Sequence, residues 1–263
     1  MDKYSTIEIE EKGQVATIWL NRPEVHNAFN EVMVSEIIEA FKLLETKKVI
    51  RIIVLQGRGK SFCAGADLNW MKDVVNYGFD QNYNESYNLS VCFNKIYTSK
   101  KITIALVHGA AIGGANGLMA ACDFVYAEPD TVFSLSEVKI GLIPACIGPY
   151  IIKRVGEFAA KEFMLSGLRF NGEIAERKGL INKSIPKDEF AGYFQKMVSL
   201  LLTSGPEATV QCKELIHSLS NNISYSEALE YTAKMIAEIR QSEEGQEGMN
   251  AFLGKRKPNW VKN

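Results

Sequence analysis

The sequence predicts an α/β protein with a helical C-terminal region. Apolar runs rich in Ile and Val alternate with segments of helical apolar spacing through the first part of the chain. From Lys187 onward almost every segment has a helical pattern. A length of 263 residues fits one α/β domain, alone or with a small appendage. We therefore expect an α/β core over residues 1–186 and a helical region over residues 187–263.

Strands and helices alternate in the first half of the chain. Residues 6–11 and 15–20 predict a hairpin, because the Lys12-Gly13 turn lies between them. Asn30 is a helix-capping residue followed by apolar residues at helical spacing, which predicts a helix from Glu31 to Thr46. The other expected elements are a strand at 50–57, a helix from residue 68, a mobile polar loop at 76–85, a helix at 89–99, a strand at 102–107, a helix at 117–122, and strands at 123–128 and 131–136.

The pattern changes after Gly156. Residues 157–167 and 173–179 are expected to be helices, and residues 180–185 a short strand. The remaining helical region is expected in three pieces, with breaks at Gly205-Pro206 and at Asn221-Asn222. No low-complexity linker separates the two halves.

Composition excludes several classes of function. A formal net charge of −1 gives no reason to expect binding to nucleic acid or to an anionic membrane. Three scattered His and no CxxC pair argue against a metal site. The N-terminal residues carry acids and no cleavable apolar core, so we expect a cytoplasmic protein. In a reducing compartment the five cysteines are expected to be free, buried thiols; they are Cys63, Cys92, Cys122, Cys146 and Cys212.

One uncharged stretch, residues 102–122, is long enough to span a bilayer. It contains His108, Asn116 and four glycines, and it divides into a β-branched run and a small-residue helical run. We therefore interpret it as a buried strand, a tight turn and a buried helix rather than as a membrane span.

Two glycine turns are the first candidates for chemistry, because each follows a buried strand and opens a helix. They are Ala64-Gly65-Ala66-Asp67 and Gly113-Gly114-Ala115. If the two turns meet in space, their backbone N–H groups would supply two donors for one oxyanion. The alternative for each turn alone is close packing of a helix on a strand. Neither turn matches GxGxxG or a P-loop, and GxSxG is absent.

Glu137 is the candidate proton carrier. It lies between an apolar strand and another apolar segment, and partial burial would raise the pKa of its carboxyl group as proton transfer requires. A loop glutamate paired with Lys139 is the alternative, and the residues alone do not separate the two.

Six ordered motifs resemble those of the enoyl-CoA hydratase/isomerase (crotonase) superfamily, nearly from end to end. They are LNRPEVHNAF, FCAGADL, VHGAAIGGANGLMAACD, FSLSEVKIGLIP, GLINKSIP and GMNAFLGKRKP. The residues of the middle segments look most like those of the bacterial methylglutaconyl-CoA hydratase-like branch. The resemblance implies a spiral of repeated ββα units with C-terminal helices that build a trimer, often stacked as a hexamer.

The resemblance also implies the site. The N–H groups of Ala66 and Gly114 would form an oxyanion hole for the thioester carbonyl, and Glu137 would be the acid/base. Family hydratases usually carry a second glutamate, but this chain has Gly117 there, and the neighbouring Asn116 cannot transfer a proton at neutral pH. Contacts to coenzyme A are implied for Val25, Ala28, Ala64, Ala66, Asp67, Leu68 and Gly114, and from an adjacent subunit for Phe252 and Lys255.

A 2-enoyl-CoA hydratase is the function that we favour, and the resemblance points to branched substrates such as 3-methylglutaconyl-CoA. The alternatives are an enoyl-CoA isomerase that uses the same glutamate and a non-catalytic CoA-binding scaffold. No cofactor is expected, since coenzyme A is part of the substrate. The acyl group is expected to bind among residues 70–87, whose packing the sequence does not specify.

Overall fold

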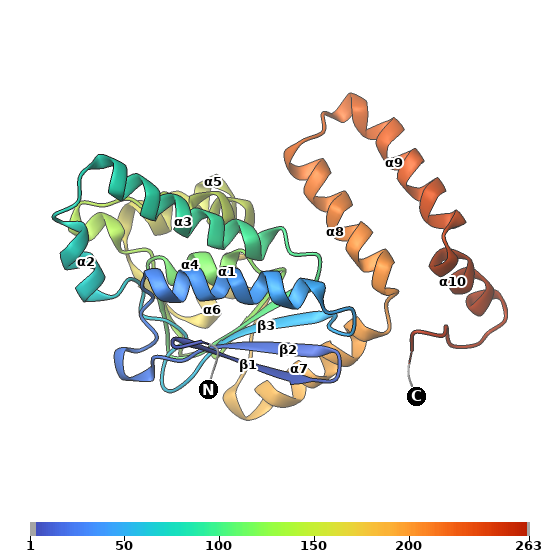
Figure 1. Ribbon diagram of the computed structural model, residues 1–263, viewed down its shortest axis with the longest axis horizontal. Helices are drawn as coiled ribbons and strands as arrows, with labels where there is room; N and C mark the ends of the chain where they lie inside the picture. The colour runs from blue at the N-terminus through green and yellow to red at the C-terminus, as the bar shows by residue number, and fades with distance from the viewer. Residues whose placement is uncertain (1–3, 262–263) are drawn as a thin grey trace. The chain divides into compact units, whose positions relative to one another are not determined.

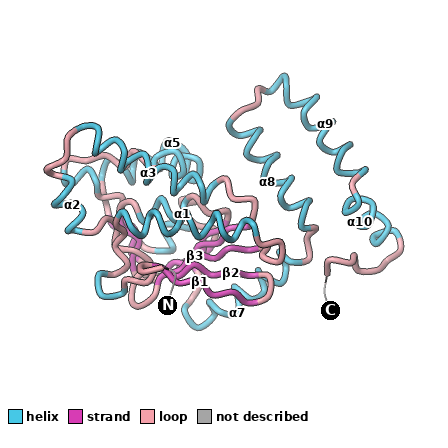
Figure 2. Tube along the Cα trace, in the orientation of Figure 1, coloured by secondary structure: helices cyan, strands magenta, loops and turns pink. Residues whose placement is uncertain are grey.

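The computed structural model describes residues 4–261 (Figure 1). The chain divides into two compact units, with the boundary between Phe190 and Ala191. The described strands all lie in the first unit, and the second unit is helical (Figure 2). The predicted α/β class with a helical C-terminal region is therefore confirmed.

The first unit is built on a six-stranded sheet in the order β1-β2-β3-β4-β6-β9. β1 is antiparallel to β2, and the other neighbouring strands are parallel. The bounds are β1 Ile7–Lys12, β2 Val15–Leu20, β3 Ile52–Gly57, β4 Ile102–Val107, β6 Phe124–Ala127 and β9 Lys183–Ser184. Every residue of β4 is buried, and so is all of β3 except Gln56, as uncharged apolar runs predict for central parallel strands.

A second, three-stranded sheet has the order β5-β7-β8, with β5 Ala110–Ile112, β7 Val132–Ser134 and β8 Arg169–Phe170. The chain passes from the large sheet to the small one twice, from β4 to β5 and from β6 to β7. After each passage it enters a helical turn, first α4 (Ala115–Ala120) and then the 3₁₀ helix η2 (Glu137–Ile140). This repetition agrees with the expected ββα units and places two strand-to-helix turns side by side.

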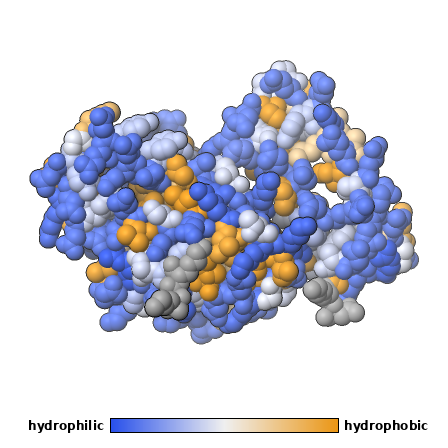
Figure 3. Space-filling model, in the orientation of Figure 1, coloured by the Kyte–Doolittle hydropathy of each residue, from blue (hydrophilic) through white to orange (hydrophobic). Residues whose placement is uncertain are grey.

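The helices of the first unit have the following bounds: the 3₁₀ helix η1 Pro23–Val25, α1 Glu31–Thr46, α2 Leu68–Val74, α3 Phe79–Tyr97, α5 Gly148–Ser166 and α6 Gly172–Arg177. α1 and α3 pack against each other and lie side by side in Figure 1. The part of the space-filling view in which α3 lies is largely hydrophilic (Figure 3). The helix predicted from Glu31 to Thr46 is confirmed at both ends, and the side chain of Asn30 accepts a hydrogen bond from the Met33 N–H.

The loop expected at residues 76–85 is wrong for residues 79–85, because α3 begins at Phe79; residues 76–78 connect α2 to α3 outside any helix. Phe79, Tyr83 and Tyr87 recur every four residues, and their rings stack with centroids 6.2 and 6.1 Å apart. Such i,i+4 contacts stabilise a helix whose polar residues face outward. The polar composition was thus the exposed surface of a helix rather than the mark of a loop.

α5 (Gly148–Ser166) consists of two helical segments that meet at Gly156, whose φ of +72° and ψ of 166° are not helical. The helix expected over residues 157–167 is the second of these segments, and the segment before Gly156 was not predicted. The cysteine prediction holds in part: Cys63, Cys92 and Cys122 are buried free thiols, whereas Cys146 is half-buried and Cys212 is exposed.

Four helices follow β9: α7 Lys187–Leu202, which crosses the boundary of the units, α8 Pro206–Asn221, α9 Tyr225–Gln241 and α10 Glu243–Leu253. The breaks at Gly205-Pro206 and Asn221-Asn222 are confirmed. A further break at Ser242, which ends α9 and caps α10, was not predicted. None of the described helices is long and apolar enough to cross a membrane.

Candidate active site

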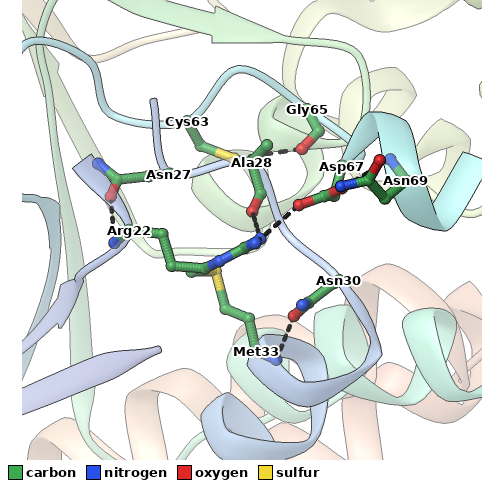
Figure 4. Close-up of polar contacts among 9 residues, drawn as sticks. All are labelled: Arg22, Asn27, Ala28, Asn30, Met33, Cys63, Gly65, Asp67 and Asn69. Carbon is green, nitrogen blue, oxygen red and sulfur yellow. Dashed lines mark hydrogen bonds and ion pairs between the residues drawn. The ribbon is translucent and has the colours of Figure 1, made fainter. Parts of the chain in front are cut away.

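Arg22 lies at the centre of the contacts that hold the first glycine turn, as Figure 4 shows. Its guanidinium forms an ion pair with Asp67, at 2.8 Å between Nη2 and Oδ2, and Nη1 donates a hydrogen bond to the Ala28 carbonyl. Asp67 also accepts a hydrogen bond from the Asn69 N–H and so caps α2. Burial alone would raise the pKa of Asp67, but the Asn69 N–H and the Arg22 guanidinium bring it below its ordinary value.

Backbone hydrogen bonds join Phe29 to the same turn. The Phe29 N–H donates to the Gly65 carbonyl, and the Asp67 N–H donates to the Phe29 carbonyl. Phe29 and Ala66 therefore pair as in a parallel β-bridge. This pairing leaves out the Ala66 N–H, and no hydrogen bond uses it within residues 4–261.

The second glycine turn connects β5 to α4. Gly113 has a φ of +55°, in the left-handed region that favours glycine, and its N–H donates to the Ser134 carbonyl at 2.8 Å. Gly114 is the residue that precedes the first turn of α4. In the described part of the chain the Gly114 N–H, like that of Ala66, donates no hydrogen bond.

The two glycine turns lie against each other. Cys63 pairs with Ala111 in a parallel bridge, and a Cβ on Gly65 would lie 2.7 Å from the Ile112 carbonyl oxygen. The Phe29 ring fills the space beside Gly114, where a Cβ would lie 2.6 Å from the ring atom Cζ. The glycines thus permit close packing, as the alternative interpretation requires. They also leave two unused N–H groups on adjoining turns, an arrangement suited to stabilising an oxyanion.

Glu137 lies beside the second turn, at the start of η2. Its Oε1 is 3.3 Å from the position that a Cβ on Gly113 would occupy. Its Oε2 is buried and has no hydrogen-bond partner in the described structure, so the alternative pairing with Lys139 is not formed. Burial raises the pKa of the Glu137 carboxyl group above its ordinary value. A buried carboxyl group without a counter-charge is suited to accepting and returning a proton.

Comparisons with known proteins agree on the family. The family model for enoyl-CoA hydratase/isomerase matches residues 10–263. A putative enoyl-CoA hydratase of Thermus thermophilus is 34% identical over 94% of this chain and 98% of its own length. The chain belongs to the enoyl-CoA hydratase/isomerase family.

Solved structures of family members have the same fold. An enoyl-CoA hydratase of Shewanella pealeana superposes with a TM-score of 0.94 at 38% identity, over 98% of this chain and 97% of that one. A putative enoyl-CoA hydratase/isomerase (crotonase) of Legionella pneumophila has a TM-score of 0.90 at 39% identity, over 97% of this chain and 99% of that one. The predicted crotonase fold is therefore confirmed. The family acts on acyl-CoA thioesters, so the protein is an enzyme.

Gly117, the position at which the resemblance implies a second glutamate, is enclosed by apolar side chains. A Cβ on Gly117 would lie 2.3 Å from Ile147 Cγ2 and 2.8 Å from Phe93 Cζ. Both of these side chains are buried. The space for a second carboxylate is thus occupied by Ile147 and Phe93, which leaves Glu137 as the carboxylate beside the second turn.

The residues implied for coenzyme A binding fall into two groups. Val25, Ala28, Ala64, Asp67 and Leu68 lie on or next to the segments that Arg22 and Phe29 hold together; Val25 and Leu68 are exposed, and Ala28 and Asp67 are buried. Phe252 and Lys255 belong to the second unit. Phe252 is 83% exposed at the end of α10, and Lys255 follows that helix with a φ of +51°.

Sequence reasoning did not identify the residues that support the site. Arg22 and Phe29 both stand in the LNRPEVHNAF segment, so their motif was noticed, but their contacts with Asp67 and Gly114 were not predicted. The only signal for Arg22 in the sequence was its position directly before Pro23, a residue that favours a turn. No comparable signal exists for Phe29, because its ring packs on a residue 85 positions later.

Proposed function

We propose that the protein is an enoyl-CoA hydratase that adds water to a 2-enoyl-CoA, with Glu137 as its single acid/base. The observation that carries this proposal is the position of Glu137, with a buried, unpartnered Oε2, beside a turn whose Gly114 N–H is unused. The relatives named as enoyl-CoA hydratases support it. A branched acyl group such as 3-methylglutaconyl remains the favoured substrate on the resemblance alone.

One carboxylate is enough for the addition of water, because it can take a proton from the water and return it to the substrate. Glu137 takes a proton from water while the water oxygen bonds to C3, and the C2=C3 electron pair moves toward the thioester carbonyl. The resulting enolate oxygen is held by the N–H groups of Ala66 and Gly114. C2 then takes the proton back from Glu137, which regenerates the carboxylate and the carbonyl. We propose that no cofactor is needed, because these groups supply every proton and charge that the addition requires.

An enoyl-CoA isomerase is the second candidate, and the packing around Gly117 favours it. With Ile147 and Phe93 in place of a second carboxylate, the site has the single base that a proton shuttle needs. Glu137 would remove a proton from C2 of a 3-enoyl-CoA and deliver it to C4, through a dienolate held by the same two N–H groups. A non-catalytic scaffold would need neither the buried carboxyl group nor the two unused donors.

Coenzyme A binding and assembly complete the proposal. We place the CoA moiety along Val25, Ala28, Ala64, Asp67 and Leu68, which surround the first oxyanion donor. The exposed Phe252 and Lys255 of the C-terminal unit are proposed to reach the CoA of a neighbouring subunit in a trimer or a dimer of trimers. Light scattering tests this, since a fully active monomer would contradict it. A cytoplasmic location stays a prediction from the sequence.

The deciding experiment is incubation with three substrates: crotonyl-CoA, 3-methylglutaconyl-CoA and a 3-enoyl-CoA. Hydration of either of the first two supports the hydratase, and a preference for the second supports the branched substrate. Conversion of the third to a 2-enoyl-CoA without hydration identifies the isomerase. Binding of all three compounds without turnover would overturn both the hydratase and the isomerase proposals and would support the non-catalytic CoA-binding scaffold.

A further inference from the structure

Asn116 is a fully buried polar residue that follows the second glycine turn, and its side-chain NH₂ group donates hydrogen bonds to three backbone carbonyl groups. Its Nδ2 lies 3.1 Å from the Ala111 carbonyl, 2.9 Å from the Gly113 carbonyl and 2.9 Å from the Ser134 carbonyl. An amide NH₂ has two hydrogens, so at least one of them is shared between two carbonyl oxygens. The backbone N–H of Asn116 also donates to Gly113, at 2.9 Å.

The three carbonyl groups belong to the segments that carry the reacting groups. Ala111 lies in β5, and Gly113 immediately precedes the oxyanion donor Gly114. Ser134 ends β7, three residues before Glu137. One side chain therefore holds together the segment that presents the Gly114 N–H and the segment that presents the Glu137 carboxyl group.

The side chain of Asn116 destabilises the folded state in one respect, which argues that it has a role beyond packing. Asn116 Oδ1 is buried and has no hydrogen-bond partner within the described residues. A buried polar atom without a partner destabilises the folded state. β5 and β7 already pair through their backbones, and the Gly113 N–H already bonds to Ser134, so the strands do not depend on Asn116 to come together.

We propose that Asn116 is a positioning residue that sets the distance between the Gly114 N–H and the Glu137 carboxyl group. The inference rests on the proposed function, because it assigns the geometry of the same oxyanion site. Asn116 touches neither the substrate nor the transferred proton. It acts through the carbonyl groups of Gly113 and Ser134, and small displacements of reacting groups have large effects on rate.

The test is the Asn116→Leu variant, which keeps a similar size and removes all three donated hydrogen bonds. We expect kcat to fall by about 10–100-fold, a part of the roughly 10²–10³-fold loss typical when an oxyanion donor is removed. KM should change little, since the residues along which we place the CoA moiety lie on the first turn or beside it. Thr103→Val is the matched control: Thr103 is equally buried, and its hydroxyl bonds to Asp123 near the start of β4. This control should lower the melting temperature and leave kcat unchanged.

A second measurement does not depend on turnover. Acetoacetyl-CoA forms an enolate that absorbs in the near ultraviolet, and an oxyanion hole favours that enolate. The wild type should increase its absorbance on binding, and Asn116→Leu should do so less while keeping its affinity for free coenzyme A. If Asn116→Leu does not fold, Asn116→Ser, which retains one donor on a shorter side chain, is measured in the same way.

The outcomes separate this inference from the proposed function. A folded Asn116 variant with wild-type kcat and wild-type enolate absorbance overturns the positioning role while hydratase activity stands. A wild type that binds acetoacetyl-CoA with the absorbance change, yet turns over none of the three enoyl-CoAs, overturns the proposed reaction instead. Equal losses of kcat in Asn116→Leu and Thr103→Val would also contradict the inference, because they would reflect general destabilisation.

Discussion

Glu137 lies directly against Gly113, with Oε1 3.3 Å from the position of a Cβ on that glycine. A side chain at residue 113 would press on the carboxyl group, and the φ of +55° would strain it further. The glycine therefore allows the proposed proton carrier to approach the turn that presents the Gly114 N–H.

Replacing Glu137 by Gln should abolish both hydration and isomerisation. The amide keeps the shape of the side chain but cannot exchange a proton at neutral pH, and general acid–base catalysis is worth roughly 10²–10⁴-fold. The measurement is turnover of whichever enoyl-CoA the wild type converts, with affinity for free coenzyme A as the control. A folded variant that binds coenzyme A and keeps most of its activity would show that another residue carries the proton.

The raised pKa of Glu137 predicts opposite effects of pH on activity and on stability. Catalysis needs the carboxylate, so kcat/KM should fall as pH decreases through a pKa above the ordinary 4.5. The folded state holds this proton to a higher pH than the unfolded chain, so ionisation destabilises the folded state as pH rises through that window. Glu137→Gln should therefore melt at a higher temperature than the wild type at about pH 8, and the difference should shrink toward about pH 4. If the two proteins differ in melting temperature by the same amount across this pH range, the pKa of Glu137 is not raised.

Two variants of Gly114 isolate the contribution of its N–H. The φ of −55° suits either Ala or Pro, and both add a Cβ that meets the Phe29 ring, but only Pro removes the N–H. We expect kcat of Gly114→Pro to be about 10²–10³-fold below that of Gly114→Ala, the usual effect of one oxyanion donor. Equal kcat values in the two folded variants would remove Gly114 from the oxyanion hole.

The packing around Gly117 predicts that a second glutamate cannot be restored there by one substitution. Gly117→Ala should lower the free energy of unfolding by about 1–3 kcal/mol, as overpacking does. Gly117→Glu should be less stable still and should not hydrate crotonyl-CoA faster. Adding Ile147→Ala removes the nearest atom and should recover part of the melting temperature lost by Gly117→Ala. A well-folded Gly117→Glu with faster hydration would contradict this packing.

Phe29 should control the spacing of the two oxyanion donors, because its backbone pairs with Ala66 and its ring packs beside Gly114. Phe29→Leu leaves a gap at the ring position, and we expect kcat to fall by about 10-fold through misplaced donors. Phe41→Leu is the matched control, since Phe41 is fully buried in the middle of α1. Calorimetry should show comparable destabilisation of the two variants, and kinetics should show a loss only for Phe29→Leu.

Much of the local structure was predictable because it depends on neighbours along the chain. The Asn30 cap and the apolar spacing after it set both ends of α1, and the Lys12-Gly13 turn sets the β1–β2 hairpin. The same reasoning was wrong for residues 79–85, where polar residues on an exposed helical face resembled a loop. The two glycine turns were found as strand-to-helix junctions, and Glu137 was found from its apolar surroundings.

The sequence by itself therefore determined most of the elements, the family resemblance and the candidate groups Ala66, Gly114 and Glu137. Only the tertiary structure decided that the two glycine turns touch, that Glu137 lies beside Gly113, and that Ile147 and Phe93 close the space at Gly117. The physical reason is the range of the interactions. Caps, turns and periodicity act within a few residues, whereas close packing brings together side chains that are distant in sequence and depends on the shape of every neighbour.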